Sequence, residues 1–151
     1  MKHLFYLFSA LLLVSLGACK GDDKDQAQED KEKIEQYLLD HGLTAQEHPS
    51  GMYYIITEEG TGDSPTINNH VKIKYKGYFT DGTVFDQTTG SQSAIFLLSD
   101  LIEGWQIGIP LLKRGGKGTF LFPSALCYGS NPPPGIPKNA VLIFDIELID
   151  F

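Results

Sequence analysis

Beyond Gly51, apolar and polar residues alternate with a period of two, and this pattern predicts β-strands. The segment 71–76 alternates most cleanly, with Val71, Ile73 and Tyr75 on one face and three lysines on the other. Successive side chains of a strand point to opposite faces of a sheet, so this strand is expected to be half-buried. Further strand candidates are the segments 52–56, 83–85, 95–98, 119–122 and 141–148.

Two segments have helical rather than strand-like spacing. Between residues 29 and 43, four apolar residues fall on one helical face and Gly42 stands where the helix would end. Those four residues are Ile34, Tyr37, Leu38 and Leu39. This face packs either on the domain or on a partner, and the partner could be a second copy of the chain. A shorter helix is predicted within 101–112, with Pro110 ending or interrupting it.

About five strands and one short helix, without regular alternation between them, predict an α+β domain with an antiparallel sheet. The chain has 151 residues, 42% of them hydrophobic, which allows one compact domain with appendages. We assign the domain to residues 49–151 and an amphipathic helix with its linker to residues 29–48.

The first 18 residues have the features of a secretory signal peptide. A basic start is followed by an apolar run from Leu4 to Leu16 and then by small residues. The run is too short to span a bilayer comfortably. The segment 16–19 resembles the bacterial lipobox, which implies acylation of Cys19, a lipid anchor and a location in the bacterial cell envelope. That location is the periplasmic face or the cell surface of the outer membrane. An ordinary signal peptide with an incidental cysteine is the alternative.

Residues 19–28 are polar and are predicted to form an acidic, flexible tether. Acidic runs behind a lipidated cysteine resemble the surface-export signal of some Bacteroidetes-type lipoproteins, and a plain soluble spacer is the alternative. Much of the net charge of −7 lies near this end, because residues 20–48 carry nine acidic and four basic side chains. No basic stripe occurs in residues 49–151, so nucleic-acid binding is not expected.

The cysteine and histidine content predicts neither a disulfide nor a metal site. With Cys19 lipidated, Cys127 is the one thiol left, and it is interpreted as a small buried hydrophobe. No cysteine or histidine spacing is typical of zinc. No cofactor and no metal is therefore expected.

Aromatic and aliphatic residues recur through the last half of the chain where strands would bring them together. They predict an apolar cup with few polar groups and no nucleophile, and Asp86 is the one carboxylate beside it. A plain hydrophobic core is the alternative interpretation of the same residues. The set comprises Tyr75, Phe85, Ile102, Trp105, Tyr128, Ile136 and Phe144.

From about Met52 to Phe151, the chain resembles the FKBP-type peptidyl-prolyl isomerases. The resemblance lies in five segments that occur in order at compatible spacing: VKIKYKG at 71–77, DGTVFD at 81–86, LIEGW at 101–105, PSALCYG at 123–129 and IPKNAVLIFDIEL at 136–148. It implies a strongly curved antiparallel sheet wrapped around one short α-helix. The N-terminal helix predicted at 29–43 precedes this domain and lies outside the match. It also implies catalysis of cis–trans isomerisation at X-Pro bonds.

The resemblance also implies roles for individual residues. Trp105 would form the pocket floor, and the hydroxyl of Tyr128 and the amide of Ile102 would donate hydrogen bonds to the substrate. Asp86 would lie at the pocket edge, hydrogen-bonded to Tyr75, although a catalytic acid or base is the alternative for this carboxylate. Tyr75, Phe85 and Phe144 would form the aromatic walls. Leu101 and Ile102 would form one side, and Ile136 would belong to a closing loop.

The predicted activity is a non-covalent isomerisation, in which an aromatic pocket desolvates and twists the amide. Expected substrates are proline-containing unfolded or exported polypeptides. Macrolides related to FK506 and rapamycin are further expected ligands, although Ala94 at a third aromatic wall position should weaken the binding of bulky ones. A non-catalytic peptide-binding chaperone and a structural lipoprotein of a cell-envelope complex are the alternative functions.

Overall fold

The computed structural model describes residues 22–151. The predicted signal peptide over 1–18, Cys19 and the first residues of the predicted tether lie outside the described residues. Within the described part of the chain, no helix is both long and apolar enough to cross a membrane.

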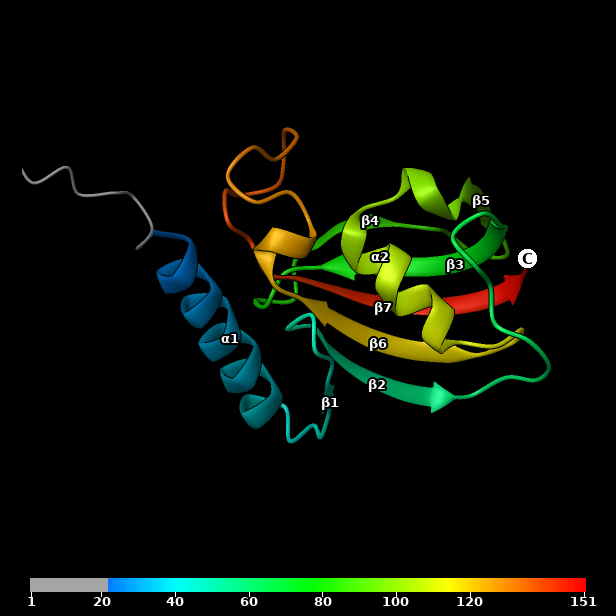
Figure 1. The fold of residues 1–151 in the computed structure, drawn as a ribbon, viewed down its shortest axis with the longest axis horizontal. Coiled ribbons are helices and arrows are strands. Elements are labelled where there is room, and N and C mark those ends of the chain that lie inside the picture. Colours follow the sequence, from blue (N-terminus) through cyan, green and yellow to red (C-terminus); the bar gives the residue numbers. More distant parts are fainter. Residues whose placement is uncertain (1–21) are drawn as a thin grey trace, which may run out of the picture.

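Seven strands of residues 22–151 form one antiparallel sheet, in the order β1-β2-β6-β7-β3-β4, with β5 also paired to β3 (Figure 1). This arrangement confirms the predicted α+β class, with more strands than the expected five or so. The strands are β1 (Gln46–Glu47), β2 (Tyr53–Glu58), β3 (His70–Tyr78), β4 (Val84–Gln87), β5 (Ala94–Leu97), β6 (Lys117–Phe122) and β7 (Leu142–Asp150).

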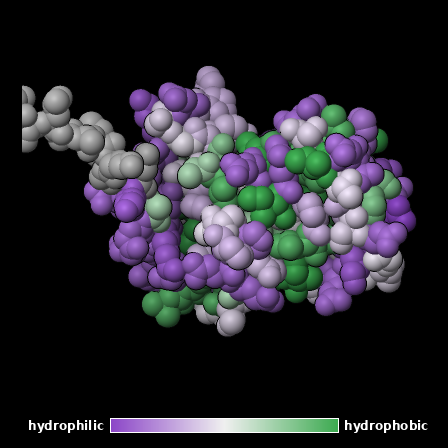
Figure 2. All heavy atoms as spheres, viewed as in Figure 1, coloured by the Kyte–Doolittle hydropathy of each residue, from purple (hydrophilic) through white to green (hydrophobic). Residues whose placement is uncertain are grey.

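The helix α2 (Glu103–Gly108) covers one face of this sheet, which we call the inner face (Figure 1). Apolar residues gather in the same region of the space-filling view (Figure 2). Two glycines allow the close approach, because a Cβ at Gly104 would lie 2.7 Å from the ring of Phe122 and one at Gly108 would lie 3.0 Å from Phe120. The 3-10 turn that follows, Ile109–Leu111, contains Pro110, which confirms that this proline interrupts the helix.

The helix α1 (Asp22–Asp40) packs on the opposite, outer face of the sheet. Ile34 is fully buried, and Leu38 is nearly so, in a cluster with Tyr53, Leu121 and Ile143. The alternation of β6 and β7 explains the two clusters, because the neighbours of Leu121 and Ile143 along their strands face α2 instead. Of the two alternatives for the helix, the structure shows packing on its own domain.

Three features of α1 differ from or refine the prediction. The helix begins at Asp22 rather than near residue 29, so the prediction of a flexible tether is wrong for residues 22–28. Polar i,i+4 pairs support this first part, such as Gln26 to Asp30 at 2.8 Å, and apolar periodicity could not reveal them. Leu39 is 75% exposed and does not belong to the buried face. Gly42, at φ +62°, follows the helix end as predicted.

The packing of α1 predicts unequal effects of two leucine-sized truncations. Ile34→Ala should lower the free energy of unfolding by about 2–4 kcal/mol, because it removes a fully buried side chain. Leu39→Ala, on the exposed side of the same helix, should change it by less than about 0.5 kcal/mol. Urea denaturation of both variants checks this, and equal small effects would contradict the observed docking of α1.

Candidate functional site

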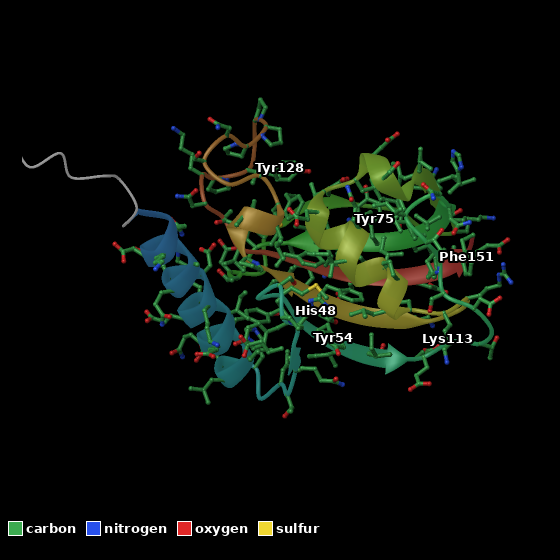
Figure 3. The ribbon with its side chains drawn as sticks, viewed as in Figure 1. His48, Tyr54, Tyr75, Lys113, Tyr128 and Phe151 are labelled. Carbon is green, nitrogen blue, oxygen red and sulfur yellow. The ribbon has the colours of Figure 1, made fainter. Side chains whose placement is uncertain are left out.

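A hollow of about 130 Å³ lies between the inner face of the sheet and the start of α2. This volume is roughly four times the 30 Å³ that one water molecule occupies in the liquid, so the rings around it are not packed solid. Figure 3 labels two of its residues, Tyr75 and Tyr128. The full lining consists of Tyr75, Phe85, Asp86, Phe96, Leu101, Ile102, Trp105, Tyr128 and Phe144.

Trp105 lies at the centre of the aromatic contacts around the hollow. Its indole is 5% exposed and meets Tyr75 at 5.1 Å and Phe144 at 5.0 Å between ring centroids, both edge to face. Such T-shaped contacts stabilise aromatic pairs without the rings having to stack flat. Within residues 22–151, the buried indole Nε1 has no hydrogen-bond partner. An unpaired buried donor is costly, so this atom is one of the unsatisfied polar groups of the protein interior.

The walls Phe85 and Phe144 meet at 5.5 Å and 89°, and Gly77 makes this meeting possible. Gly77 of β3 pairs with Asp86 of β4 and with Phe144 of β7. A Cβ at this position would lie 2.7 Å from each of the two rings. Gly77 is thus a site-forming residue that sequence reasoning missed, because it was read only as part of a motif.

Tyr75 and Asp86 form the hydrogen bond that the resemblance implied. The hydroxyl of Tyr75 donates to Oδ2 of Asp86 at 2.6 Å across β3 and β4. Burial, followed by this hydrogen bond, raises the pKa of Tyr75 well above its ordinary value. Tyr75 therefore stays a neutral donor, and the exposed carboxylate of Asp86 is held at the edge of the hollow.

Two potential donors to a bound peptide flank the hollow. Tyr128 is 38% exposed, and burial raises the pKa of its hydroxyl, with Cys127 and Asp86 as smaller causes. Ile102 immediately precedes α2, and its N–H makes no hydrogen bond to any of the described residues. Both groups can therefore donate to the carbonyl oxygens of a ligand that lies over Trp105.

Phe96 lines the hollow although the sequence reading did not select it. The sequence predicts that Ala94, at the start of β5, occupies the third aromatic wall position. In the structure, Ala94 pairs with Ile73 of β3 and does not line the hollow. The Phe96 ring lies 6.4 Å from that of Trp105. Strand alternation could have found it, because the adjacent Ile95 is 63% exposed and Phe96 must face the other way.

Of the predicted substrate-binding residues, Ile136 is the one that the structure does not place in the lining. It is half-buried and packs against the main core instead. Its loop is tied locally, since its N–H donates to the carbonyl of Pro133 at 3.2 Å. Proline-rich loops carry no periodicity, so the sequence alone could not fix where this side chain lies.

Volume alone does not single out this hollow. A larger one of about 1060 Å³ lies between α1 and the turn after β6, but none of its lining residues is aromatic. Among residues 22–151, no group of three or more His, Cys, Asp or Glu side chains could hold a metal ion. Burial also raises the pKa of the Cys127 thiol, which disfavours the reactive thiolate. The aromatic lining, with its few donors, distinguishes the smaller hollow.

Comparisons with known proteins agree with this geometry. Residues 62–149 match the family model described as FKBP-type peptidyl-prolyl cis-trans isomerase. The FKBP-type isomerase FkpA of Aeromonas hydrophila is 41% identical over 132 residues, which cover 84% of this chain and 48% of the relative. FkpA of Escherichia coli K12 is 35% identical over 130 residues, or 85% of this chain and 47% of the relative. The chain thus spans about half the length of these curated relatives.

Solved structures show the same similarity in three dimensions. The crystal structure of FkpA from Escherichia coli aligns with a TM-score of 0.74 at 35% identity, covering 85% of this chain and 60% of that one. A peptidyl-prolyl cis-trans isomerase from Pseudomonas syringae aligns with a TM-score of 0.72 at 27% identity, covering 84% and 93%. The chain therefore belongs to the FKBP-type peptidyl-prolyl cis-trans isomerase family.

Proposed function

We propose that this protein accelerates cis–trans isomerisation of X-Pro bonds in unfolded or exported polypeptides. The observation that carries the proposal is the hollow over Trp105, which is walled by aromatic rings and flanked by two donors that no other residue of 22–151 engages. Membership of the isomerase family supports the same assignment. The prolyl ring would enter the hollow, and the flanking backbone would lie along its rim.

The mechanism follows from the electronic structure of the amide. Rotation about the C–N bond breaks its conjugation, at a barrier of about 18–20 kcal/mol, so uncatalysed exchange takes roughly tens to hundreds of seconds. Water solvates the planar, more polar amide better than the twisted one and so keeps the barrier high. The rings of Phe85, Trp105 and Phe144 replace that water by apolar surface, which favours the twisted form.

The hydrogen-bond donors would hold the substrate rather than react with it. The Tyr128 hydroxyl and the Ile102 N–H would bind carbonyl oxygens next to the rotating bond and fix its orientation. Rotation about the C–N bond makes and breaks no bond to hydrogen, so the reaction requires no net transfer of a proton. Asp86 accepts a hydrogen bond from the Tyr75 hydroxyl at 2.6 Å and so orients that hydroxyl. Its negative charge would also act on the distorted carbonyl of the substrate.

The proposal also includes where the protein works and what else it binds. The signal peptide over 1–18 and acylation of Cys19 would anchor residues 49–151, the isomerase domain, in the bacterial cell envelope, where newly exported chains are the substrates. Macrolides related to FK506 and rapamycin would occupy the same hollow, and Phe96 provides an aromatic wall for them. A chaperone that holds clients on a free α1 face is disfavoured, because that face is packed on the sheet.

Truncation of one wall tests the role of the hollow. Phe85→Ala should lower kcat/KM for a proline peptide by about 10- to 100-fold, equivalent to about 1.4–2.7 kcal/mol of transition-state stabilisation. Val84→Ala, at the partly exposed neighbouring position of β4, is the matched control and should leave the rate unchanged. A protease-coupled isomerisation assay measures both, and equal rates for the two folded variants would refute the proposed site.

The hydroxyl of Tyr128 has a smaller expected effect. Tyr128→Phe should reduce kcat/KM by roughly 3- to 10-fold, the value of about one net hydrogen bond. Tyr54→Phe removes a hydroxyl that bonds to Gln46 at the surface, away from the hollow, and should have no effect on the rate. The same assay distinguishes the two, and a Tyr128→Phe variant as fast as the original chain would exclude the hydroxyl as a substrate ligand.

The absence of proton transfer predicts a flat pH profile. Burial raises the pKa values of Tyr75 and Tyr128 above their ordinary value of about 10, so both hydroxyls keep their protons throughout pH 6–9. We expect kcat/KM to change by less than about two-fold over this range, measured by exchange NMR with no coupling protease. A bell-shaped profile would show general acid–base catalysis instead.

A further inference from the structure

The N-terminal helix α1 is joined to the site through a buried carboxylate. Asp30 is 1% exposed and Ser124 is 2% exposed. Oδ2 of Asp30 accepts hydrogen bonds from the N–H of Ser124 at 2.8 Å and from its hydroxyl at 2.5 Å. A buried charge is tolerated only when it is well paired, and charge-assisted bonds of this kind are the stronger ones.

The rest of the Asp30 carboxylate is also paired, within α1 itself. Oδ1 accepts from Nε2 of Gln26 at 2.8 Å, and Nζ of Lys33 lies 3.8 Å away. These contacts orient the carboxylate toward Ser124. The helix therefore presents a fixed acceptor to the segment that follows β6.

Ser124 begins the turn that carries Tyr128. Its carbonyl oxygen accepts from the N–H of Cys127 at 3.0 Å and from that of Gly129 at 2.9 Å. Ser124 is thus held by α1 through its N–H and hydroxyl, and it closes the turn over 124–129 through its carbonyl oxygen. Tyr128 lies between the two donors, outside any strand.

A second connection holds the far end of this turn. The carbonyl of Gly129 accepts from the N–H of Asn139 at 2.8 Å, and the side-chain amide of Asn139 donates to Oε1 of Gln26 at 2.7 Å. Asn139 has a φ of +53°, a left-handed conformation that is uncommon except for glycine and asparagine. Gln26 and Asp30, one turn apart on α1, therefore hold both ends of the turn, next to which α1 lies in Figure 1.

These polar bonds link the turn to α1, while Leu126 within the turn packs into the main core. The large hollow of about 1060 Å³ lies between the two segments and is lined by residues of both. The hydroxyl of Tyr128 has no hydrogen bond to another described residue that would fix it independently. A misplacement of about 1 Å in a substrate-holding group can cost a factor of about 100 in rate.

We propose that Asp30 and Gln26 are positioning residues of the isomerase, which act by holding the turn that places the Tyr128 hydroxyl at the hollow. The inference rests on the proposed function of that hydroxyl. It makes α1 part of the catalytic unit, although α1 contributes no residue to the lining of the hollow.

A kinetic double-mutant cycle on the full-length chain tests this coupling. Asp30→Ala should lower kcat/KM by about 3- to 10-fold, as Tyr128→Phe does, and the double variant should fall by less than about two-fold beyond Tyr128→Phe alone. Glu32→Ala, an exposed carboxylate on the same helix, is the matched control and should leave the rate unchanged. The inference would be overturned if the fold reduction in kcat/KM of the double variant equalled the product of the two single reductions. A folded Asp30→Ala variant with unchanged kcat/KM would overturn it as well.

Amide hydrogen exchange provides a readout that does not depend on activity. In Asp30→Ala, the N–H of Gly129 should exchange at least about 10-fold faster, while that of Ile146 in the centre of β7 should not change. Equal acceleration at both amides would show general loosening and overturn the inference. Ser124→Ala, which removes only the hydroxyl bond, replaces Asp30→Ala if the latter does not fold. If the original chain had no isomerase activity, the proposed function would be refuted. The hydrogen exchange of Gly129 would still show whether α1 holds the turn.

Discussion

The close approach of α2 to the inner face of the sheet is the constraint on which the rest of the structure depends. Gly104 and Gly108 leave no side chain between the helix and the rings of Phe122 and Phe120, so the helix can rest on β6. That contact fixes Trp105, the residue after Gly104, against Tyr75 and Phe144. These rings meet edge to face and form the floor and walls of the hollow.

The two faces of the sheet have different tasks, and both contribute to the site. The inner face supplies the aromatic walls, and Gly77 leaves the room that Phe85 and Phe144 need. The outer face binds α1 through Ile34 and Leu38, an apolar contact that brings Asp30 to Ser124. The helix α1 therefore belongs to the same folded unit as residues 49–151. The boundary predicted near residue 48 divides the sequence but does not divide the packed structure.

The sequence was informative where a single segment determines the outcome. Period-two alternation identified the long strands, and ordered motifs placed Trp105, Tyr75, Phe85 and Phe144 around one hollow before any coordinates. The sequence was less informative where contacts between distant segments determine the structure. The helical start at Asp22 depends on polar pairs, and the Asp30–Ser124 bond joins two segments with no local pattern. Phe96 lines the hollow in place of the predicted Ala94. Ile136 lies in a loop whose path no periodicity predicts.

We propose that an apolar hollow over Trp105 speeds the rotation of a prolyl amide. Two-dimensional exchange NMR of an X-Pro peptide with a substoichiometric amount of the chain tests it most directly, and the chain's single tryptophan reports binding in the same sample. We expect cis–trans exchange peaks that are absent without the protein, together with a shifted indole N–H. A shifted indole with exchange as slow as in buffer would show that the hollow binds proline without catalysing its isomerisation.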